Sequence, residues 1–515
     1  MPAERARADL KDDAMELLTT TEMSRADALA VAAGVPSFAL MTSAGRAVAE
    51  ASESLVPDGE IVVVAGQGNN GGDGFVAACE LARLGRSVRV VLLGRREALK
   101  GDAAKAAAGW SGGIAVGDPD AIGHPALIVD ALFGAGLDRP VEGQPKAAIE
   151  AMNASGAPIV AVDLPSGVNG TTGEVMGIAV RATETVTFFR RKPAHLLLPG
   201  RQLCGRVRVV DIGIPAEVLD QIAPAAFENA PQFWRESFPV PRIDGHKYSR
   251  GHAVVISGGP AATGAARLAA RGALRAGAGL STLATPRDAL AINATAVTAV
   301  MVRAIDTPAE LAAMLSDARL NACVIGPGNG VGQRTRDLVL AALEGDRAVV
   351  LDADALTSFE DDPEMLFQAI KVGKERRIVM TPHLGEFTRI FKGKIDHSKS
   401  NSKLELVRLA ASISGAVVVL KGADTTVASP DGTATIAANA PPWLATAGAG
   451  DVLSGMIAGL LAQHVPPFAA ASMGVWMHGD AARRVGPGLI AEDLSEVLPA
   501  VTRALYERFG IEMPG

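Results

Sequence analysis

Short runs of apolar residues alternate with helical patterns along most of the chain. In the first half, the pattern predicts two helices within residues 13–50, broken near residue 34, and then a series of buried strands. These strands are expected at residues 61–65, 88–93, 127–130, 159–163 and 185–189. Because polar or glycine-rich turns and helical segments separate them, an α/β fold with a mostly parallel sheet is predicted.

The same alternation returns in the second half. Predicted strands, some with the loop that follows, lie at residues 253–257, 322–330, 348–354, 378–386 and 416–421. Between the halves, from Ile214 onward, prolines recur and the periodicity fades. We therefore expect two α/β domains, residues 1–218 and 240–515, joined by a linker at residues 219–239.

Composition narrows the classes of function. The chain has 515 residues, 48% of them hydrophobic, and 56 glycines, which suits two α/β domains with many tight turns. Its formal charge of -7 gives no basic surface for nucleic acid. The 3 cysteines lack paired spacing, and neither a signal peptide nor a long uncharged apolar run is seen. We expect a cytoplasmic protein that binds neither nucleic acid nor membrane.

The segment at residues 66–71 reads GQGNNG and matches GxGxxG between a strand and a helix. Alone, this loop suggests a dinucleotide-binding oxidoreductase. The next strand ends in Gly94-Arg95-Arg96 and offers no acid for a ribose hydroxyl, although an arginine there could meet a 2′-phosphate. The loop is also rich in polar side chains, Asn69, Asn70 and Asp73, whereas a pyrophosphate loop needs bare backbone.

Polar groups also follow the next two strands. Asp130 ends the strand at residues 127–130, and Asp163 and Ser166 follow the strand at residues 159–163. Carboxyl ends of parallel strands share one crevice, so these oxygens could converge and bind a cation. The alternative is that each acid caps its own turn.

Three motifs carry a family resemblance. GQGNNGGDGF, VDALFGAGL and VDLPSGVNGTTGEV, with the opening helices, resemble the NAD(P)H-hydrate epimerase (YjeF N-terminal) domain over about residues 15–215. The resemblance implies that Asn70, Asp130 and Ser166 hold potassium. It also implies that Lys192, in FFRRKPAH, works with Asp163 in proton transfer, although Ala194 stands where the motif commonly has Gly. The implied contacts to the hydrated nucleotide are Asn69, Asn70, Gly71, Gly72, Asp73, Gly134, Ala135, Gly136, Leu137, Asp138, Arg139 and Asp163.

In the second half, NAPPWLATAGAGD runs directly into an apolar helical pattern. Small residues up to Gly450 allow the backbone N–H groups to approach an anion at a helix N-terminus, with Asp451 in the first turn. This layout suits removal of a proton from a hydroxyl next to a phosphate, but Asp451 could equally cap the helix. Lys421 ends a predicted strand and could meet phosphate or be a solvated terminus. His383 and Glu386 lack a third metal ligand.

The ordered set HKYSRGH, GPGNG, TPHLGE, KGADT and NAPPWLATAGAGD resembles the ribokinase-like NAD(P)H-hydrate dehydratase domain from about residue 240 to the end. The resemblance implies that Asp451 is the catalytic base and that magnesium bridges the phosphates of ADP or ATP. Its implied contacts are Ala265, Gly328, His383 and Asp451 with the hydrated cofactor, and Lys421, Gly422, Ala423, Asp424, Thr425 and Gly450 with the nucleotide. Ala449 replaces a more usual Ser and removes one hydroxyl donor.

Together these resemblances predict a Rossmann-like three-layer domain followed by a ribokinase-like α/β domain. The predicted function is bifunctional: R and S forms of NADHX and NADPHX are interconverted, and the S form is dehydrated at the expense of ADP, or ATP. The sequence itself gives no oligomeric state, and we expect a homo-oligomer. The alternatives are a ribokinase-like small-molecule kinase, a binding role with a silent first half, and an NADP oxidoreductase.

Overall fold

The computed structural model describes residues 14–372, 377–396 and 402–512. The chain divides into two compact units, residues 1–227 and 228–515, and the division falls inside the predicted linker. Within the described residues, no helix is both long and apolar enough to cross a lipid bilayer.

The first unit is built on a parallel sheet with strand order β4-β3-β2-β5-β6-β7-β8. The described strands are β1 (Glu16–Leu17), β2 (Ile61–Ala65), β3 (Val88–Leu92), β4 (Ile114–Val116), β5 (Leu127–Ala131), β6 (Ile159–Val162), β7 (Glu184–Phe188), β8 (Arg206–Val210) and β9 (Ala226–Glu228). The described α-helices are α1 (Thr20–Ala32), α2 (Ser37–Leu55), α3 (Asn69–Arg83), α4 (Gly101–Gly109), α5 (Gly143–Ala154), α6 (Gly200–Leu203) and α7 (Val218–Ile222).

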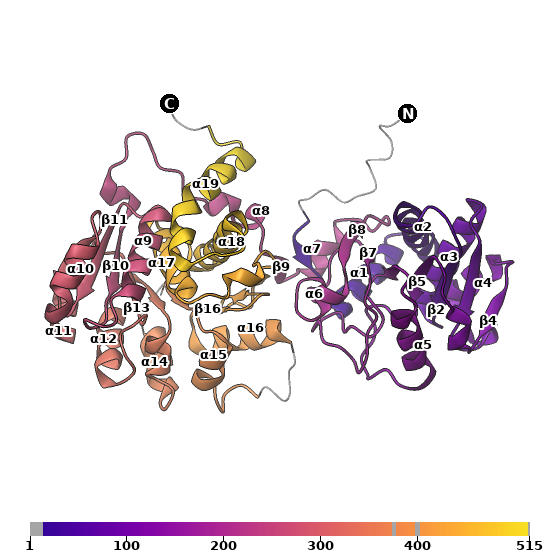
Figure 1. Ribbon diagram of the computed structural model, residues 1–515, viewed down its shortest axis with the longest axis horizontal. Helices are drawn as coiled ribbons and strands as arrows, with labels where there is room; N and C mark the ends of the chain where they lie inside the picture. The colour runs from indigo at the N-terminus through magenta and orange to yellow at the C-terminus, as the bar shows by residue number, and fades with distance from the viewer. Residues whose placement is uncertain (1–13, 373–376, 397–401, 513–515) are drawn as a thin grey trace. The chain divides into compact units, whose positions relative to one another are not determined.

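Alternate residues of the central strand β2 face two separate apolar cores. Ile61 and Val63 pack in the core that α2, α3 and α4 cover, whereas Val62 and Val64 pack in the core that α5 covers. A strand buried on both faces needs a continuous apolar run, which is the pattern seen in the sequence. This arrangement confirms the predicted three-layer architecture (Figure 1).

The second unit contains a larger sheet, of which β12-β11-β10-β13-β14-β15-β16 are parallel and β17 and β18 antiparallel. The described strands are β10 (His252–Ile256), β11 (Leu280–Thr285), β12 (Met301–Ala304), β13 (Ala322–Ile325), β14 (Ala348–Leu351), β15 (Ile378–Met380), β16 (Val417–Leu420), β17 (Thr426–Ala428) and β18 (Ala434–Ile436). The described α-helices are α8 (Pro231–Trp234), α9 (Gly264–Arg275), α10 (Leu290–Ala296), α11 (Pro308–Leu315), α12 (Gln333–Leu343), α13 (Asp354–Thr357), α14 (Pro363–Lys371), α15 (Leu384–Ile390), α16 (Lys403–Ser414), α17 (Ala449–Ala462), α18 (Pro467–Val485) and α19 (Ala491–Phe509).

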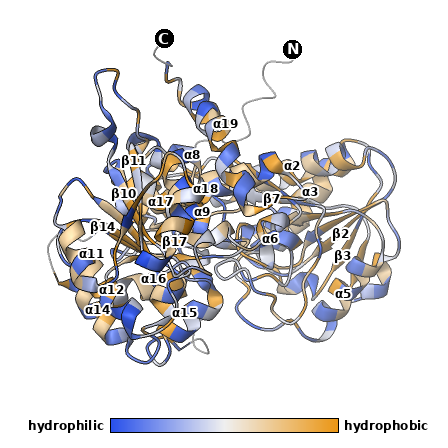
Figure 2. Ribbon diagram, turned by 60° about the vertical axis from the view of Figure 1, so that its left-hand side comes forward, coloured by the Kyte–Doolittle hydropathy of each residue, from blue (hydrophilic) through white to orange (hydrophobic). Residues whose placement is uncertain are grey.

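Helix α17 is the buried centre of this unit. It packs with α9, α18 and α19 over one face of the sheet, and α12 and α14 lie on the other side (Figure 1). Its sequence is apolar on every side, as expected for a helix without a solvent face. Contact with α9 is close, since a Cβ atom at Gly455 would lie 2.0 Å from the Ala269 carbonyl oxygen. Figure 2 shows apolar residues along the strands and polar residues on outer helices such as α16.

Two expectations about local structure are wrong. Asn69, Asn70 and Asp73 were expected on a loop, but they lie in the first turns of α3. The glycines among them lower helix propensity, yet they allow close packing: a Cβ atom at Gly74 would lie 2.5 Å from the Ala131 Cβ. Tertiary packing therefore outweighs local propensity here.

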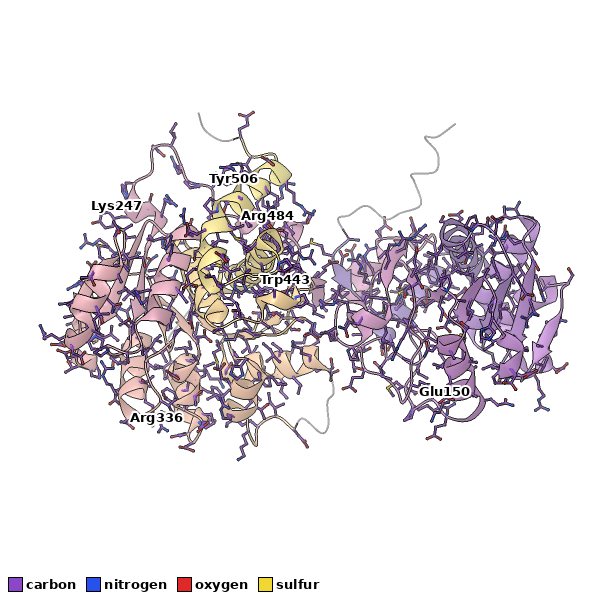
Figure 3. All side chains as sticks on the ribbon, in the orientation of Figure 1. Glu150, Lys247, Arg336, Trp443, Arg484 and Tyr506 are labelled. Carbon is purple, nitrogen blue, oxygen red and sulfur yellow. The ribbon has the colours of Figure 1, made fainter. Side chains whose placement is uncertain are left out.

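Part of the segment expected to be a linker belongs to the core of the second unit. Trp234 is 1% exposed, and its ring lies 5.9 Å from the Phe509 ring. Its Nε1 donates to Asn229 Oδ1 at 3.2 Å. The aromatic residues that interrupted the sequence periodicity are thus packing residues. Trp443, labelled in Figure 3, similarly donates from Nε1 to the Ala482 carbonyl oxygen on α18 at 2.8 Å.

Candidate active sites

The first unit contains a cavity of about 1120 Å³ at the carboxyl ends of its parallel strands. Helices α1 and α2, the start of α3 and the loops after β5, β6 and β7 line it. The predicted site residues that line it are Asn69, Asn70, Asp73, Gly134, Ala135, Gly136, Leu137, Asp138, Arg139, Asp163 and Lys192. Gly71 and Gly72 are buried in α3 and do not line this cavity.

Asp163 is the centre of a hydrogen-bonded cluster in this cavity. Its Oδ1 accepts from Lys192 Nζ at 2.5 Å and from Thr187 Oγ1 at 2.9 Å. Its backbone has φ of 66°, a left-handed conformation that costs energy for a residue with a side chain. The surrounding bonds hold this strained conformation, so the carboxylate is fixed in position before substrate binds.

His195 is a second fixed group, which the sequence analysis missed. Its Nδ1 accepts from the Lys192 backbone N–H at 2.9 Å, so its Nε2 carries the proton and donates to the Asp163 carbonyl oxygen at 3.0 Å. Burial, and then the charge of Lys192, lower its pKa to about 4. His195 is therefore neutral at physiological pH and positions both Lys192 and Asp163. Its place three residues after Lys192 in KPAH was the available signal.

Electrostatics separate the carboxyl groups of the cavity into two classes. Burial raises the pKa of Asp163, but the ion pair with Lys192 outweighs it and leaves the pKa below its usual value. Burial and the charge of Asp163 hold the pKa of Asp73 well above its usual range. Asp27, a residue of α1 that the sequence analysis missed, is exposed at the cavity, and loss of hydration beside the cavity walls is the main cause that raises its pKa to about 6. Asp163 therefore stays a carboxylate, while the pKa of Asp73 is shifted toward its protonated form.

Asp130 and Ser166, two of the predicted potassium ligands, are brought together beneath this cavity. Ser166 donates to Asp130 from Oγ at 2.6 Å and from its backbone N–H at 2.7 Å, and both residues are 0% exposed. Asn70 lies against the neighbouring loop, since a Cβ atom at Gly134 would lie 2.8 Å from Asn70 Oδ1. Burial raises the pKa of Asp130 to about 6.

In the second unit, Asp451 lies in the first turn of α17. Gly448 caps the helix with φ of 85°, a conformation that glycine adopts without strain. Lys421, at the end of β16, approaches the same turn, because a Cβ atom at Gly450 would lie 3.4 Å from Lys421 Nζ. Free N–H groups, an ammonium group and a carboxylate thus meet at one helix start. Burial, and then the charge of Asp352, raise the pKa of Asp451 to about 6, although Lys421 opposes this.

Asp352 is a buried residue of this site that the sequence analysis missed. It follows β14, is 1% exposed, and accepts from Lys421 Nζ at 2.8 Å and from the Ala353 N–H at 2.9 Å. Ser454 Oγ, one turn into α17, also donates to it. Asp352 therefore ties the end of β16 to the start of α17. The run AVVLDAD at a strand end was the signal that could have identified it.

The predicted nucleotide segment, residues 421–425, forms a tight turn between β16 and β17. Thr425 Oγ1 donates to the Gly422 carbonyl oxygen at 2.7 Å, and Lys403 Nζ contacts Asp424 Oδ1 at 2.6 Å. Gly422 and its neighbour Ala423 are exposed, whereas Asp424 is buried. Lys403, from α16, was not expected here and adds a second ammonium group next to Lys421.

The remaining predicted residues of this site lie on different loops and helices near the carboxyl ends of the same strands. His383 is the exposed N-cap of α15, and its Nδ1 accepts from the Gly385 N–H at 2.9 Å. Ala265 and Gly328 are adjacent, since a Cβ atom at Gly328 would lie 3.6 Å from the Ala265 Cβ. Within the described ranges, no group of three or more His, Cys, Asp or Glu side chains is placed to hold a metal.

Two families match separate parts of the chain. The one described as YjeF-related protein N-terminus matches residues 37–194, and the one described as NAD(P)H-hydrate dehydratase matches residues 253–499. A relative from Moorella thermoacetica, named Bifunctional NAD(P)H-hydrate repair enzyme Nnr, is 37% identical over 96% of this chain and 98% of its own length. The chain belongs to this family of bifunctional repair enzymes.

The chain is also similar to a second relative and to a solved structure. A relative of the same name from Thermofilum pendens is 35% identical, covering 92% of this chain and 94% of its own. The solved ADP/ATP-dependent NAD(P)H-hydrate dehydratase from Bacillus subtilis, co-crystallised with ATP and Mg²⁺, is 29% identical. It covers 54% of this chain and 98% of its own, with a TM-score of 0.46. Family membership confirms the pairing of an epimerase domain with a dehydratase domain, and we therefore set aside the kinase and oxidoreductase alternatives.

Proposed function

We propose that the first unit interconverts the R and S hydrates of NADH and NADPH through Asp163 and Lys192. The second unit then dehydrates the S hydrate with ADP or ATP, and Asp451 is its base. The observation that carries this proposal is a repeated arrangement: each unit holds a carboxylate and a lysine at the carboxyl ends of parallel strands. A dehydratase specific for one hydrate needs an epimerase, so the two activities belong together.

In the epimerase site, Asp163 is suited to accept a proton. Lys192 and Thr187 keep it a carboxylate. Among the described residues, its Oδ2 accepts only a 3.3 Å bond from the Ala135 N–H. A hydroxyl or water that binds beside Oδ2 can pass its proton to this oxygen. Lys192, fixed by His195, stabilises the carboxylate between turnovers. Asp73, whose pKa is raised well above its usual range, can donate a hydrogen bond to the substrate when it carries its proton.

In the dehydratase site, Asp451 is suited to take the proton from the hydroxyl of the hydrate. The hydroxyl oxygen then attacks the terminal phosphoryl group of the nucleotide, and elimination of the resulting phosphate ester releases phosphate and leaves NADH or NADPH. In this proposal the N–H groups at the start of α17 and the Lys421 ammonium bind the phosphates, which is supported by their closeness at one helix start. Mg²⁺ held by the phosphates of the nucleotide would supply charge neutralisation there.

We also propose a potassium ion at Asn70, Asp130 and Ser166. These side chains offer oxygen atoms, the ligands that hard cations prefer. Within the described residues, Asp130 forms no ion pair, and burial alone raises its pKa. A monovalent cation beside Asp130 would offset the cost of burying its charge. ADP as the preferred co-substrate, a homo-oligomer and a cytoplasmic location stay predictions.

The decisive experiment supplies an R/S mixture of NADHX with ADP and Mg²⁺ and follows NADH absorbance. The wild type is expected to recover all of the NADH. Asp451→Ala should abolish dehydration and keep R/S exchange, whereas Asp163→Ala should stop recovery at the S fraction, apart from slow spontaneous exchange. Glu150→Ala, an exposed position on α5 (Figure 3), is the control and should behave as wild type. Loss of both activities from either site variant, in a folded protein, would contradict two separate sites.

A further inference from the structure

Asp27 is a titratable group in the epimerase cavity that the proposed mechanism does not use. It projects from α1, whereas Asp163 and Lys192 follow β6 and β7, so the cavity presents carboxyl groups from different elements. Its side chain is exposed to the cavity, and no ion pair to it occurs within the described part of the chain. The charges of Lys192 and Asp163 both act on it, which places the three groups within electrostatic reach of one another.

Inversion at the hydrated carbon needs proton transfer on both faces of the nicotinamide ring. The hydroxyl that departs from one face must gain a proton, and the water that adds to the other face must lose one. A single fixed carboxylate on one wall cannot reach both oxygens. An acid is therefore required in addition to the base Asp163.

We propose that Asp27 is a further catalytic residue of the epimerase, the general acid that protonates the departing hydroxyl. This assignment rests on the epimerase activity proposed above. The C–O bond breaks as the hydroxyl takes the Asp27 proton and leaves as water, and the ring nitrogen lone pair forms a C=N bond. Water then adds to the opposite face, the C=N electrons return to nitrogen, and Asp163 takes the proton. Exchange with solvent restores both groups, and the reverse reaction uses the same steps.

The other charged groups that face the cavity are less suited to this role. Asp73 also lines the cavity, but desolvation and the charges of Asp163 and Asp27 hold its pKa well above its usual range, so it is a weak acid. Asp102 on α4 pairs with Lys105 at 3.0 Å, and hydrogen bonds to Ser37 and Lys105 lower its pKa, so it stays a carboxylate. Asp138, Arg139 and Glu142 lie on the loop after β5, and the Lys192 ammonium is engaged by Asp163 and Thr187. Asp27, with a pKa raised to about 6, both holds and releases a proton near neutral pH.

The test uses the full chain carrying Asp451→Ala, so that R/S exchange of NADHX is observed without dehydration. Adding Asp27→Asn should lower the exchange rate by about a hundredfold or more. It should also remove the decline in rate that sets in above about pH 6 as Asp27 loses its proton. Asp27→Glu should recover part of the rate. Asp102→Asn, a carboxyl of the same cavity, should stay within about twofold of the parent. A thermal unfolding transition of the first unit that matches the parent's verifies that Asp27→Asn is folded, since dehydration reports on the second unit alone.

Three results would count against the assignment. An unchanged rate and pH profile in Asp27→Asn would overturn it. An equal loss in Asp102→Asn would also overturn it, because the cavity charge rather than proton donation would then control the rate. If the Asp451→Ala parent exchanges the hydrates no faster than they exchange spontaneously in buffer, the proposed epimerase activity itself fails. That failure is visible before any Asp27 variant is made.

Discussion

Replacement of Asp352 by Asn is expected to destabilise the second unit strongly. Asp352 and Lys421 form a buried ion pair at 2.8 Å, with side chains 2% and 20% exposed. Asn keeps the shape and one acceptor oxygen but leaves the Lys421 ammonium without its counter-charge. Coulomb attraction at this distance and an effective dielectric constant of about 20 is roughly 6 kcal/mol, and the cost of desolvation cancels part of it. Because Lys421 keeps some contact with water, we expect a loss of about 3 kcal/mol.

The loss is measured as thermal unfolding of the full chain. About 3 kcal/mol corresponds to a fall of roughly 6–12 °C in the Tm of the second unit. Asp354→Asn is the matched control: Asp354 is two residues away and accepts from the Gly330 N–H at 2.8 Å, so Asn preserves its role and should cost less than about 1 kcal/mol. In Asp352→Asn/Lys421→Met, no unpaired charge is left, and much of the stability should return.

The same variant changes catalysis in a defined direction. The negative charge of Asp352 helps to raise the pKa of Asp451, so Asp352→Asn should lower that pKa and move the acidic limb of dehydration to lower pH. A fall in stability below about 1 kcal/mol, or a double variant whose loss equals the sum of the two single losses, would refute the reasoning. Either result would mean that the ion pair contributes little to the site.

Three further expectations follow from the two sites. Dehydration should fall about tenfold for each pH unit below about 6, as Asp451 gains its proton, and a rate versus pH profile measures this. Lys192→Met should lower the rate of R/S exchange by about a hundredfold. The loss of rate at acidic pH should also begin at a higher pH, because Lys192 lowers the pKa of Asp163. An unchanged acidic part of the pH profile would contradict the pairing of Lys192 with Asp163. Replacing choline by potassium should raise the Tm of the first unit more at pH 8 than at pH 5. The reason is that potassium binding needs ionised Asp130, whose pKa is about 6. Asp130→Asn should abolish this difference in Tm.

The sequence predicts those features that depend on local pattern. Apolar runs located the central strands of both sheets to within a few residues, whereas the outer strands β4, β8, β11, β12, β17 and β18 were not predicted. The rule that parallel strands end at one edge brought Asp163 and Asp73 into one cavity. Motif order then identified the family. Each of these inferences needs only neighbouring residues or the general order of strands.

Pairing between distant residues could not be predicted in this way. Asp352 and Lys421 meet because β14, β15 and β16 are adjacent in the sheet, and Asp27 reaches the cavity because α1 packs beside strands far along the chain. The start of α3 was misjudged because glycine is a poor helix former, and only the close approach of Ala131 explains its presence. Such errors arise where tertiary contacts override local preference.

The two sites impose opposite limits on the pH at which the whole repair cycle runs. Dehydration needs ionised Asp451 and declines below about pH 6, because burial and Asp352 raise the pKa of this base. Exchange through Asp27 needs a protonated acid and declines above about pH 6, because loss of hydration beside the cavity walls raises that pKa to a similar value. Full recovery of NADH from an R/S mixture should therefore be fastest within about one unit of pH 6.5. Asp27→Glu and Asp352→Asn should shift the two limits independently, since each group belongs to a different unit.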